Sequence, residues 1–242
     1  MESSTIKPDR SKILIVDDQL NNIQVLIPVL EVHANYSIAY ALSGSEALER
    51  IEAINPDLIL LDLYMPEMSG LEVCQIIKNN PQHKDTPILF LTASHEDESL
   101  VAAFECGAAD YVTKPFKMSE LLARVEIHLK LRKQTQEIQR NQRKLDAIVN
   151  NIKDGIVVVD LDGIVRFANP AAAQMFDKPL SVLIGSKFGA PIVKEKLSKI
   201  EIVKGNGEVG VAEITVAESE WEDQPAAIAI IGLRDVSERE ES

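Results

Sequence analysis

Five short apolar segments alternate with five stretches of helical periodicity in the first half of the 242-residue chain, and this alternation restricts the fold more than any other feature. Strands that are apolar on both faces and alternate with helices form a parallel sheet covered on both sides. Right-handed crossovers then give a doubly wound α/β sandwich. The segments that we predict to be strands are Lys12–Val16, Tyr36–Leu42, Asp57–Asp62, Thr86–Ala93 and Ala109–Thr113.

Two of the predicted helices begin with a capping signal. Ser43 stands three positions before Glu46, and Ser69 stands three positions before Glu72. At a helix start, residues with this spacing bond each other's backbone N–H groups. The sequence therefore predicts a helix start at each serine.

Polar side chains follow four of the five predicted strands, all at the same edge of the sheet. They are Asp17, Asp18, Asp62, Thr92 and Lys114. The working residues of doubly wound sheets lie beyond the carboxyl ends of the strands, so we expect these side chains to converge. Three crowded carboxylates repel one another unless a cation joins them, and oxygen ligands suit Mg²⁺. A lysine and a hydroxyl can contact a phosphoryl group, and one carboxylate can attack phosphorus to give an aspartyl phosphate.

The alternative interpretation of the same residues is that the three acids are solvated loop residues with no common task. It would suit any one of them alone. It does not explain why a threonine and a lysine end strands at the same edge.

Four motifs give this half of the chain a specific resemblance. They are ILIVDD at 13–18, LILLDLYMPEMSG at 58–70, ILFLTA at 88–93 and GAADYVTKPF at 107–116. The stretch from Lys12 to Lys130 resembles the receiver domain of bacterial two-component response regulators. The resemblance implies a flavodoxin-like sheet of five parallel strands.

The resemblance also implies a role for each polar residue. Asp62 would be the phospho-acceptor, and Lys114 would contact the phosphoryl group from a cis peptide bond to Pro115. Thr92 and Tyr111 would form the switch pair. Mg²⁺ would be the cofactor, held by Asp17, Asp18, Asp62 and the backbone carbonyl of Tyr64.

The formal net charge of −13 is distributed unevenly along the chain. Residues 1–118 carry 18 acids and 8 bases, residues 119–152 carry 4 and 7, and residues 153–242 carry 16 and 10. Two acidic blocks that flank a basic connector indicate two domains and a linker. The overall acidity argues against nucleic acid or an anionic membrane as the main partner.

The basic connector lacks proline and glycine from Ser119 to Gly155, which predicts one long helix. Apolar residues recur every seven positions at Leu131, Ile138, Leu145 and Ile152, whereas the second seam position carries Thr135, Gln142 and Val149. Seven-residue periodicity is typical of coiled coils, and we interpret residues 130–144 as a linker that forms a parallel stalk. We expect a homodimer through this linker, through the PAS domain or through both. A solvated helix packed within its own chain is one alternative, and a DNA-binding basic helix is another.

The last block has the pattern of a small antiparallel α+β domain. A strand ends at Asp160, an Asp162-Gly163 turn leads to a second strand, and Asn169-Pro170 starts a helix. Three more strands follow, with a turn at Asn206-Gly207. The stretches IVVVDLDGIVRFANPAAAQMF at 156–176 and LRDVSERE at 233–240 resemble a PAS domain. Since no His or Cys follows His128, we expect neither haem nor flavin in this domain.

The remaining features predict a cytoplasmic protein. Two cysteines cannot form a disulfide framework, and Cys74 and Cys106 stand beside apolar neighbours in predicted helices, so we expect them to serve in packing. The first residues contain no apolar core, so no signal peptide is expected, and no apolar run is long enough for a membrane span.

We therefore predict four segments: a tail at 1–10, a receiver domain at 11–129, the helical linker at 130–144 and a PAS domain at 145–242. The predicted function is that of a response regulator. It would accept a phosphoryl group from a histidine kinase or phosphotransfer protein and relay the change through the stalk to the PAS domain. The alternative is an input fragment of a larger enzyme, either a sensor hybrid histidine kinase or a diguanylate cyclase. No output catalytic motif occurs in the sequence, although a receiver itself catalyses phosphoryl transfer to its aspartate.

Overall fold

The computed structural model describes residues 10–33, 36–92, 97–115, 117–188, 198–203, 209–214 and 229–235. The chain forms two compact units, Met1–Ile138 and Gln139–Ser242. Most of the predicted tail and the predicted Asn206-Gly207 turn lie outside the described residues.

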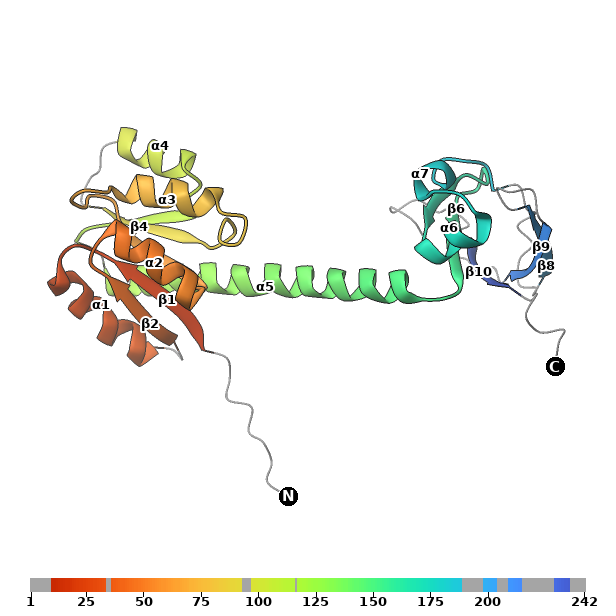
Figure 1. Ribbon diagram of the computed structural model, residues 1–242. Coiled ribbons are helices and arrows are strands. Elements are labelled where there is room, and N and C mark those ends of the chain that lie inside the picture. Colours follow the sequence, from red (N-terminus) through yellow and green to blue (C-terminus); the bar gives the residue numbers. More distant parts are fainter. Residues whose placement is uncertain are drawn as a thin grey trace, which may run out of the picture. The chain divides into compact units, whose positions relative to one another are not determined.

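The first unit contains the predicted five-stranded parallel sheet (Figure 1), and its strand order is β2-β1-β3-β4-β5. The strands are β1 (Ser11–Val16), β2 (Tyr36–Ala41), β3 (Leu58–Asp62), β4 (Ile88–Thr92) and β5 (Asp110–Thr113). The chain moves from β1 outward to β2 and then returns to the other side of β1 at β3. This reversal puts the carboxyl ends of β1 and β3 beside each other, where doubly wound sheets hold their sites.

Helices cover both faces of this sheet, which explains why its central strands are apolar throughout. The helices are α1 (Leu20–His33), α2 (Gly44–Ile54), α3 (Gly70–Asn79), α4 (Asp97–Glu105) and α5 (Met118–Asn151). Leu26 of α1 and Val125 of α5 belong to one core cluster. Ala47 of α2 and Val73 of α3 belong to the cluster on the other face. The doubly wound prediction is confirmed.

The capping signals are confirmed at both predicted helix starts. The Ser69 hydroxyl accepts the backbone N–H of Glu72, and the Glu72 carboxylate accepts the N–H of Ser69, so α3 begins with a complete capping box. At α2, the Ser43 hydroxyl accepts from Glu46, but the Glu46 carboxylate accepts from Leu42 instead. Each such cap contributes roughly 1 kcal/mol to helix stability.

The long helix α5 continues past the first unit, as the sequence predicts. Among its described residues, the buried ones are Leu121, Val125 and Leu129, all in its first turns. Farther along, Leu131 and Ile138 are exposed. Within the described residues, no helix combines the length and the apolar character that a membrane span requires.

The second unit contains the predicted antiparallel sheet, with strand order β7-β6-β10-β9-β8. Its strands are β6 (Gly155–Val159), β7 (Val165–Ala168), β8 (Ser198–Val203), β9 (Val209–Ile214) and β10 (Ala229–Asp235). Gly163 has φ +77° in the turn between β6 and β7, a conformation that favours glycine. The Asn169 side chain accepts from Ala172 and caps α6 (Pro170–Phe176), as predicted.

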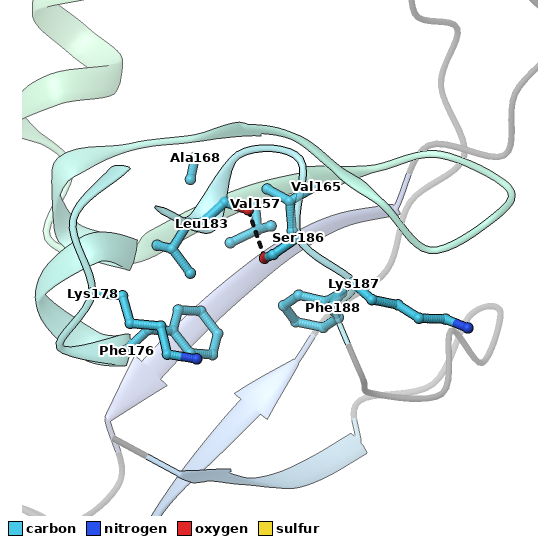
Figure 2. A pocket seen from close by; sticks show the side chains of 9 residues that line it. All are labelled: Val157, Val165, Ala168, Phe176, Lys178, Leu183, Ser186, Lys187 and Phe188. Atoms are coloured by element: carbon cyan, nitrogen blue, oxygen red, sulfur yellow. Dashed lines mark hydrogen bonds between the residues drawn. The ribbon is translucent and has the colours of Figure 1, made fainter. Parts of the chain in front are cut away.

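A second short helix, α7 (Leu180–Leu183), follows α6 and was not predicted. It has four residues and no side-chain cap, so it leaves almost no sequence signal. A cavity of about 50 Å³ lies beside these helices (Figure 2). Its lining includes Phe176, Leu183 and Phe188, with the stems of Lys178 and Lys187.

Candidate functional site

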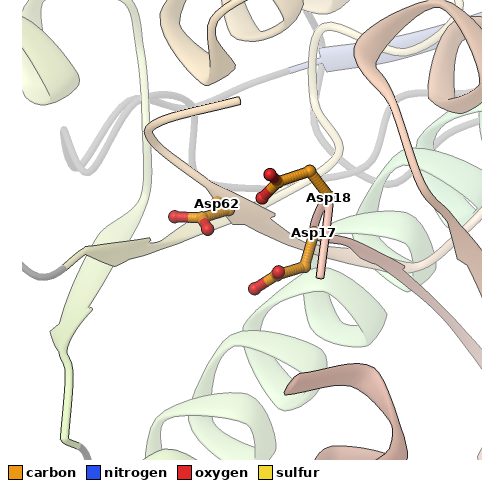
Figure 3. Close-up of side chains that lie close together, drawn as sticks. All are labelled: Asp17, Asp18 and Asp62. Carbon is orange, nitrogen blue, oxygen red and sulfur yellow. The ribbon is translucent and has the colours of Figure 1, made fainter. Parts of the chain in front are cut away.

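Three carboxylates meet at the carboxyl edge of the parallel sheet (Figure 3). Asp17 and Asp18 directly follow β1, and Asp62 is the last residue of β3. One ligand oxygen from each residue lies within 4.8 Å of the others. Asp17 and Asp62 are buried. The sequence predicted that these three residues lie at one edge of the sheet, and the structure shows that their carboxylates are in fact close together.

Lys114 joins two of these carboxylates. Its Nζ atom donates to Asp17 Oδ2 at 2.9 Å and to Asp62 Oδ2 at 2.8 Å. Lys114 follows β5, and its peptide bond to Pro115 is cis. One ammonium among three carboxylates leaves excess negative charge in the pocket, so a further cation would be stabilised there.

Asp17 is held rigidly by the start of α1. Its Oδ1 accepts from the backbone N–H of Gln19 at 2.9 Å. The Asn22 amide donates to both carboxylate oxygens, at 2.9 and 3.0 Å. Asn22 was missed by the sequence reasoning. The available signal was a polar side chain in the first turn of a helix that begins just after the acidic pair.

Asp18 has an unmet bonding demand. Its buried Oδ1 atom has no hydrogen-bond partner among the described residues. A buried oxygen without a partner is costly unless a ligand supplies one. The donor set of three carboxylates contains only oxygen, which Mg²⁺ prefers. These residues therefore fit a magnesium ion.

Burial and charge act in opposite directions on the two central groups. Burial raises the pKa of Asp62, and the hydrogen bond and charge of Lys114 offset part of that rise. Burial alone would lower the pKa of Lys114, but its bonds to Asp62 and Asp17 outweigh the effect and raise it. Lys114 therefore stays protonated, and its positive charge favours the ionised form of Asp62.

The start of α3 packs closely against the end of β3. A Cβ atom at Gly70 would lie 2.2 Å from the carbonyl oxygen of Asp62 and 3.0 Å from Leu63 Cα. Both are backbone atoms, so position 70 accepts only glycine without moving the strand. This requirement is a second feature that the sequence reasoning missed.

The remaining predicted residues lie on β4, on β5 and just after β3. Thr92 is buried at the end of β4, the strand next to β3. Tyr111 lies in β5, and its ring packs edge-on against Phe104 of α4 with centroids 5.8 Å apart. The backbone N–H of Tyr64 hydrogen-bonds the Asp62 carboxylate.

Two family models match the chain. The response regulator receiver domain matches residues 13–126, and the PAS fold matches residues 143–210. The "Probable transcriptional regulator ycf27" of Cyanidium caldarium is 33% identical over 232 residues, covering 90% of this chain and 89% of that protein. The chain belongs to the response regulator family. Its two parts are a receiver domain and a PAS fold, as the sequence resemblances implied.

Other relatives match the receiver part of this response regulator. The transcriptional regulatory protein YvrH of Bacillus subtilis is 41% identical over 134 residues, 55% of each chain. The match thus spans about half of that relative's length. The crystal structure of a signal receiver domain from Vibrio parahaemolyticus is 29% identical, with a TM-score of 0.51 over 54% of this chain and 98% of that one.

Proposed function

We propose that this response regulator accepts a phosphoryl group on Asp62 from a phosphohistidine of a histidine kinase or phosphotransfer protein. The observation that carries the proposal is the set of three converging carboxylates, two of them bridged by Lys114. Asp18 Oδ1, without a partner among the described residues, supports a bound cation at the same point.

The chain's own residues have distinct tasks in this transfer. An oxygen of Asp62 attacks phosphorus, the P–N bond of the phosphohistidine breaks, and its electron pair leaves with the imidazole. Lys114 offsets the charge of the phosphoryl oxygens, and the Thr92 hydroxyl donates to one of them. Mg²⁺, held by Asp17, Asp18, Asp62 and the Tyr64 carbonyl, supplies further positive charge when bound.

The transfer then changes the surface near α4. Thr92 moves toward the new phosphoryl oxygen, and the Tyr111 ring turns inward behind it. The edge contact of Tyr111 with Phe104 links this ring to α4. Phosphorylation would thereby alter the face of α4, β5 and α5.

Labelling by acetyl phosphate tests the proposal. With Mg²⁺ present, the wild-type chain should gain one phosphoryl group, visible as a Phos-tag shift or a mass increase. Asp62→Asn should stay unlabelled, while the neighbouring exposed variant Glu67→Gln should label like wild type. Equal labelling of Asp62→Asn and wild type would reject Asp62 as the acceptor.

We further propose that α5 forms a parallel stalk with a second copy of this chain. The seam positions Leu131, Ile138 and Leu145 are 52%, 70% and 57% exposed, and they recur every seven residues. Pairing with an identical helix would bury this stripe. Since Thr135 and Gln142 make bonds within their own helix, they add little to pairing, and the stalk should be weak.

The oligomeric state tests the stalk. Ile138→Asp should convert a dimer to a monomer in size-exclusion chromatography with light scattering. Gln136→Asp adds the same charge off the seam and should leave the dimer intact. A wild-type chain that stays monomeric at high concentration, with or without phosphorylation, would rule the stalk out.

We also propose the limits of the domains, a PAS domain without haem or flavin, and a cytoplasmic location. The domain limits 11–129, 130–144 and 145–242 are supported by the division of the two units after Ile138, inside the linker. The lack of His and Cys after His128 favours a PAS domain without haem or flavin. The scarcity of cysteines favours a cytoplasmic location.

A further inference from the structure

The two cysteines of the chain lie in contact, although 32 positions separate them. Cys74 is buried in α3, and Cys106 is partly buried in the turn that follows α4. Their sulfurs are 2.8 Å apart, and both are free thiols. A disulfide has an S–S length of about 2.05 Å, so the sulfurs need to approach by only about 0.8 Å.

The surrounding backbone fixes this approach. The Cys74 thiol lies 3.4 Å from the carbonyl oxygen of Cys106, and the Cys106 thiol lies 3.0 Å from that of Ala103. The Cys106 N–H also bonds Ala102, which continues the α4 ladder. Each thiol is thus tied to α4 or its last turn.

The Lys78 ammonium interacts electrostatically with both thiols. The Lys78 side chain runs past the turn at Gly107, where a Cβ would lie 3.3 Å from Lys78 Cγ. Its ammonium donates to the carbonyl oxygens of Lys84 and Thr86 at 3.0 and 2.8 Å. A nearby ammonium favours the thiolate of a cysteine. Cys74 is buried whereas Cys106 is partly exposed, so Cys106 is the better first nucleophile, and burial also raises the pKa of Cys74.

We propose that Cys74 and Cys106 form a reversible disulfide by exchange with a small-molecule disulfide such as oxidised glutathione. The Cys106 thiolate attacks one sulfur of the small disulfide, whose S–S bond breaks and releases one small thiol. Cys74 then loses its proton and attacks Cys106 Sγ, which releases the second small thiol. Two protein thiols are oxidised, one small disulfide is reduced, and two protons pass to the released thiols.

The bond would fasten α3 to the end of α4. Phe104, two positions before Cys106, is the α4 residue that contacts the ring of Tyr111. A fixed α4 would resist the movement of that ring. The oxidised chain should therefore be phosphorylated on Asp62 more slowly, by roughly fivefold or more, a consequence that rests on the function proposed above.

Mass spectrometry of the full chain tests the disulfide itself. After anaerobic incubation with oxidised glutathione and alkylation under denaturing conditions, wild type should carry no alkyl group, and its mass should be about 2 Da below that of the reduced chain before alkylation. A reductant should restore two alkylation sites. Wild type that remains fully alkylated, or that accumulates only a glutathione adduct or a disulfide-linked dimer, would overturn the proposal.

Two variants test the order of the steps. Cys74→Ala should accumulate a stable glutathione adduct on Cys106, because the second thiol is missing. Cys106→Ala should react at least roughly tenfold more slowly, because Cys74 is buried. An adduct that forms faster on Cys106→Ala than on Cys74→Ala would reverse the assigned roles. Cys106 is partly exposed, so its variant stays informative even where Cys74→Ala disturbs packing.

Acetyl phosphate labelling of the reduced and oxidised chains tests the consequence, with oxidant-treated Cys106→Ala as control. Slower labelling of oxidised wild type alone is the expected result. Equal rates in both states would overturn the link to phosphorylation. A chain that is labelled in neither state would contradict the proposed function, whereas the disulfide is judged from its mass alone.

Discussion

Buried polar side chains occur in both units of this response regulator, but their bonding differs. Asn169 in the second unit is buried and has its full set of partners. Its Oδ1 accepts from Ile156 and Ala172, and its Nδ2 donates to Val149 and Asp154. In the first unit, Asp18 Oδ1 is buried with no partner among the described residues.

The difference in hydrogen bonding distinguishes a residue that stabilises the fold from residues that can bind a ligand. A buried polar group whose hydrogen bonds are all made within the chain stabilises the fold and needs no ligand as a partner. A cluster of like charges with an unpaired buried oxygen carries a free-energy cost that a bound ligand would reduce. By this criterion Asn169 stabilises the second unit, whereas the arrangement of Asp17, Asp18 and Asp62 fits a bound cation.

The largest effect should come from removing Asn169. Asn169→Ala strips partners from two N–H and two C=O groups, so the second unit should lose roughly 3 kcal/mol of unfolding free energy. Amide hydrogen exchange across residues 155–176 measures this loss. The exposed Asn151, which donates to Ala147 of its own helix, is the matched control, and Asn151→Ala should change stability by less than about 0.5 kcal/mol. Similar losses in the two variants would break the contrast.

A smaller effect should appear at the acidic site when Mg²⁺ is added. At ten times its Kd, Mg²⁺ should stabilise the first unit of wild type by about 1.4 kcal/mol. Asp18→Asn should lose most of that gain, since a carboxylate ligand is missing. Urea unfolding with and without MgCl₂ measures it, and the exposed Glu49→Gln should respond as wild type does. A gain that survives in Asp18→Asn would place the cation elsewhere.

The smallest effect concerns Asp110, a partly buried carboxylate that is paired with Arg124 and His128. Burial alone would raise its pKa, but hydrogen bonds from Arg124, the Tyr111 backbone and His128 outweigh this and lower it. A lowered folded-state pKa stabilises the fold above the ordinary carboxyl pKa, and the gain is lost as pH falls through the lower value.

Asp110→Asn should therefore cost less than about 1 kcal/mol near pH 6, since Arg124 is more than a third exposed and its ion pair is screened. The gap from wild type should close as pH falls below about 4. Urea unfolding over that pH range measures it, and a gap that widens at low pH would contradict the assignment.

Much of this molecule was predictable because its signals are local. The capping serines, the apolar strands and the acids at strand ends depend on residues a few positions apart. Asn22 escaped although its partner Asp17 is only five positions away, because a single polar residue near a helix start has many other uses. Gly70 escaped because its role depends on how closely α3 approaches the end of β3, which only the fold determines. The thiol contact escaped for the same reason: packing was predicted for Cys74, which is buried in the core, but its meeting with Cys106 was not.

Gly70 also has a consequence for reading and engineering related sequences. Any side chain at this position would clash with the backbone of Asp62, so selection for function should eliminate substitutions of Gly70. In a saturation library selected for phosphorylation, position 70 should return glycine as stringently as position 62 returns aspartate. A glycine eight positions after an aspartate is then a sequence marker of this pocket. It can be recognised even in a sequence where the strand that ends at the aspartate has a weak apolar pattern.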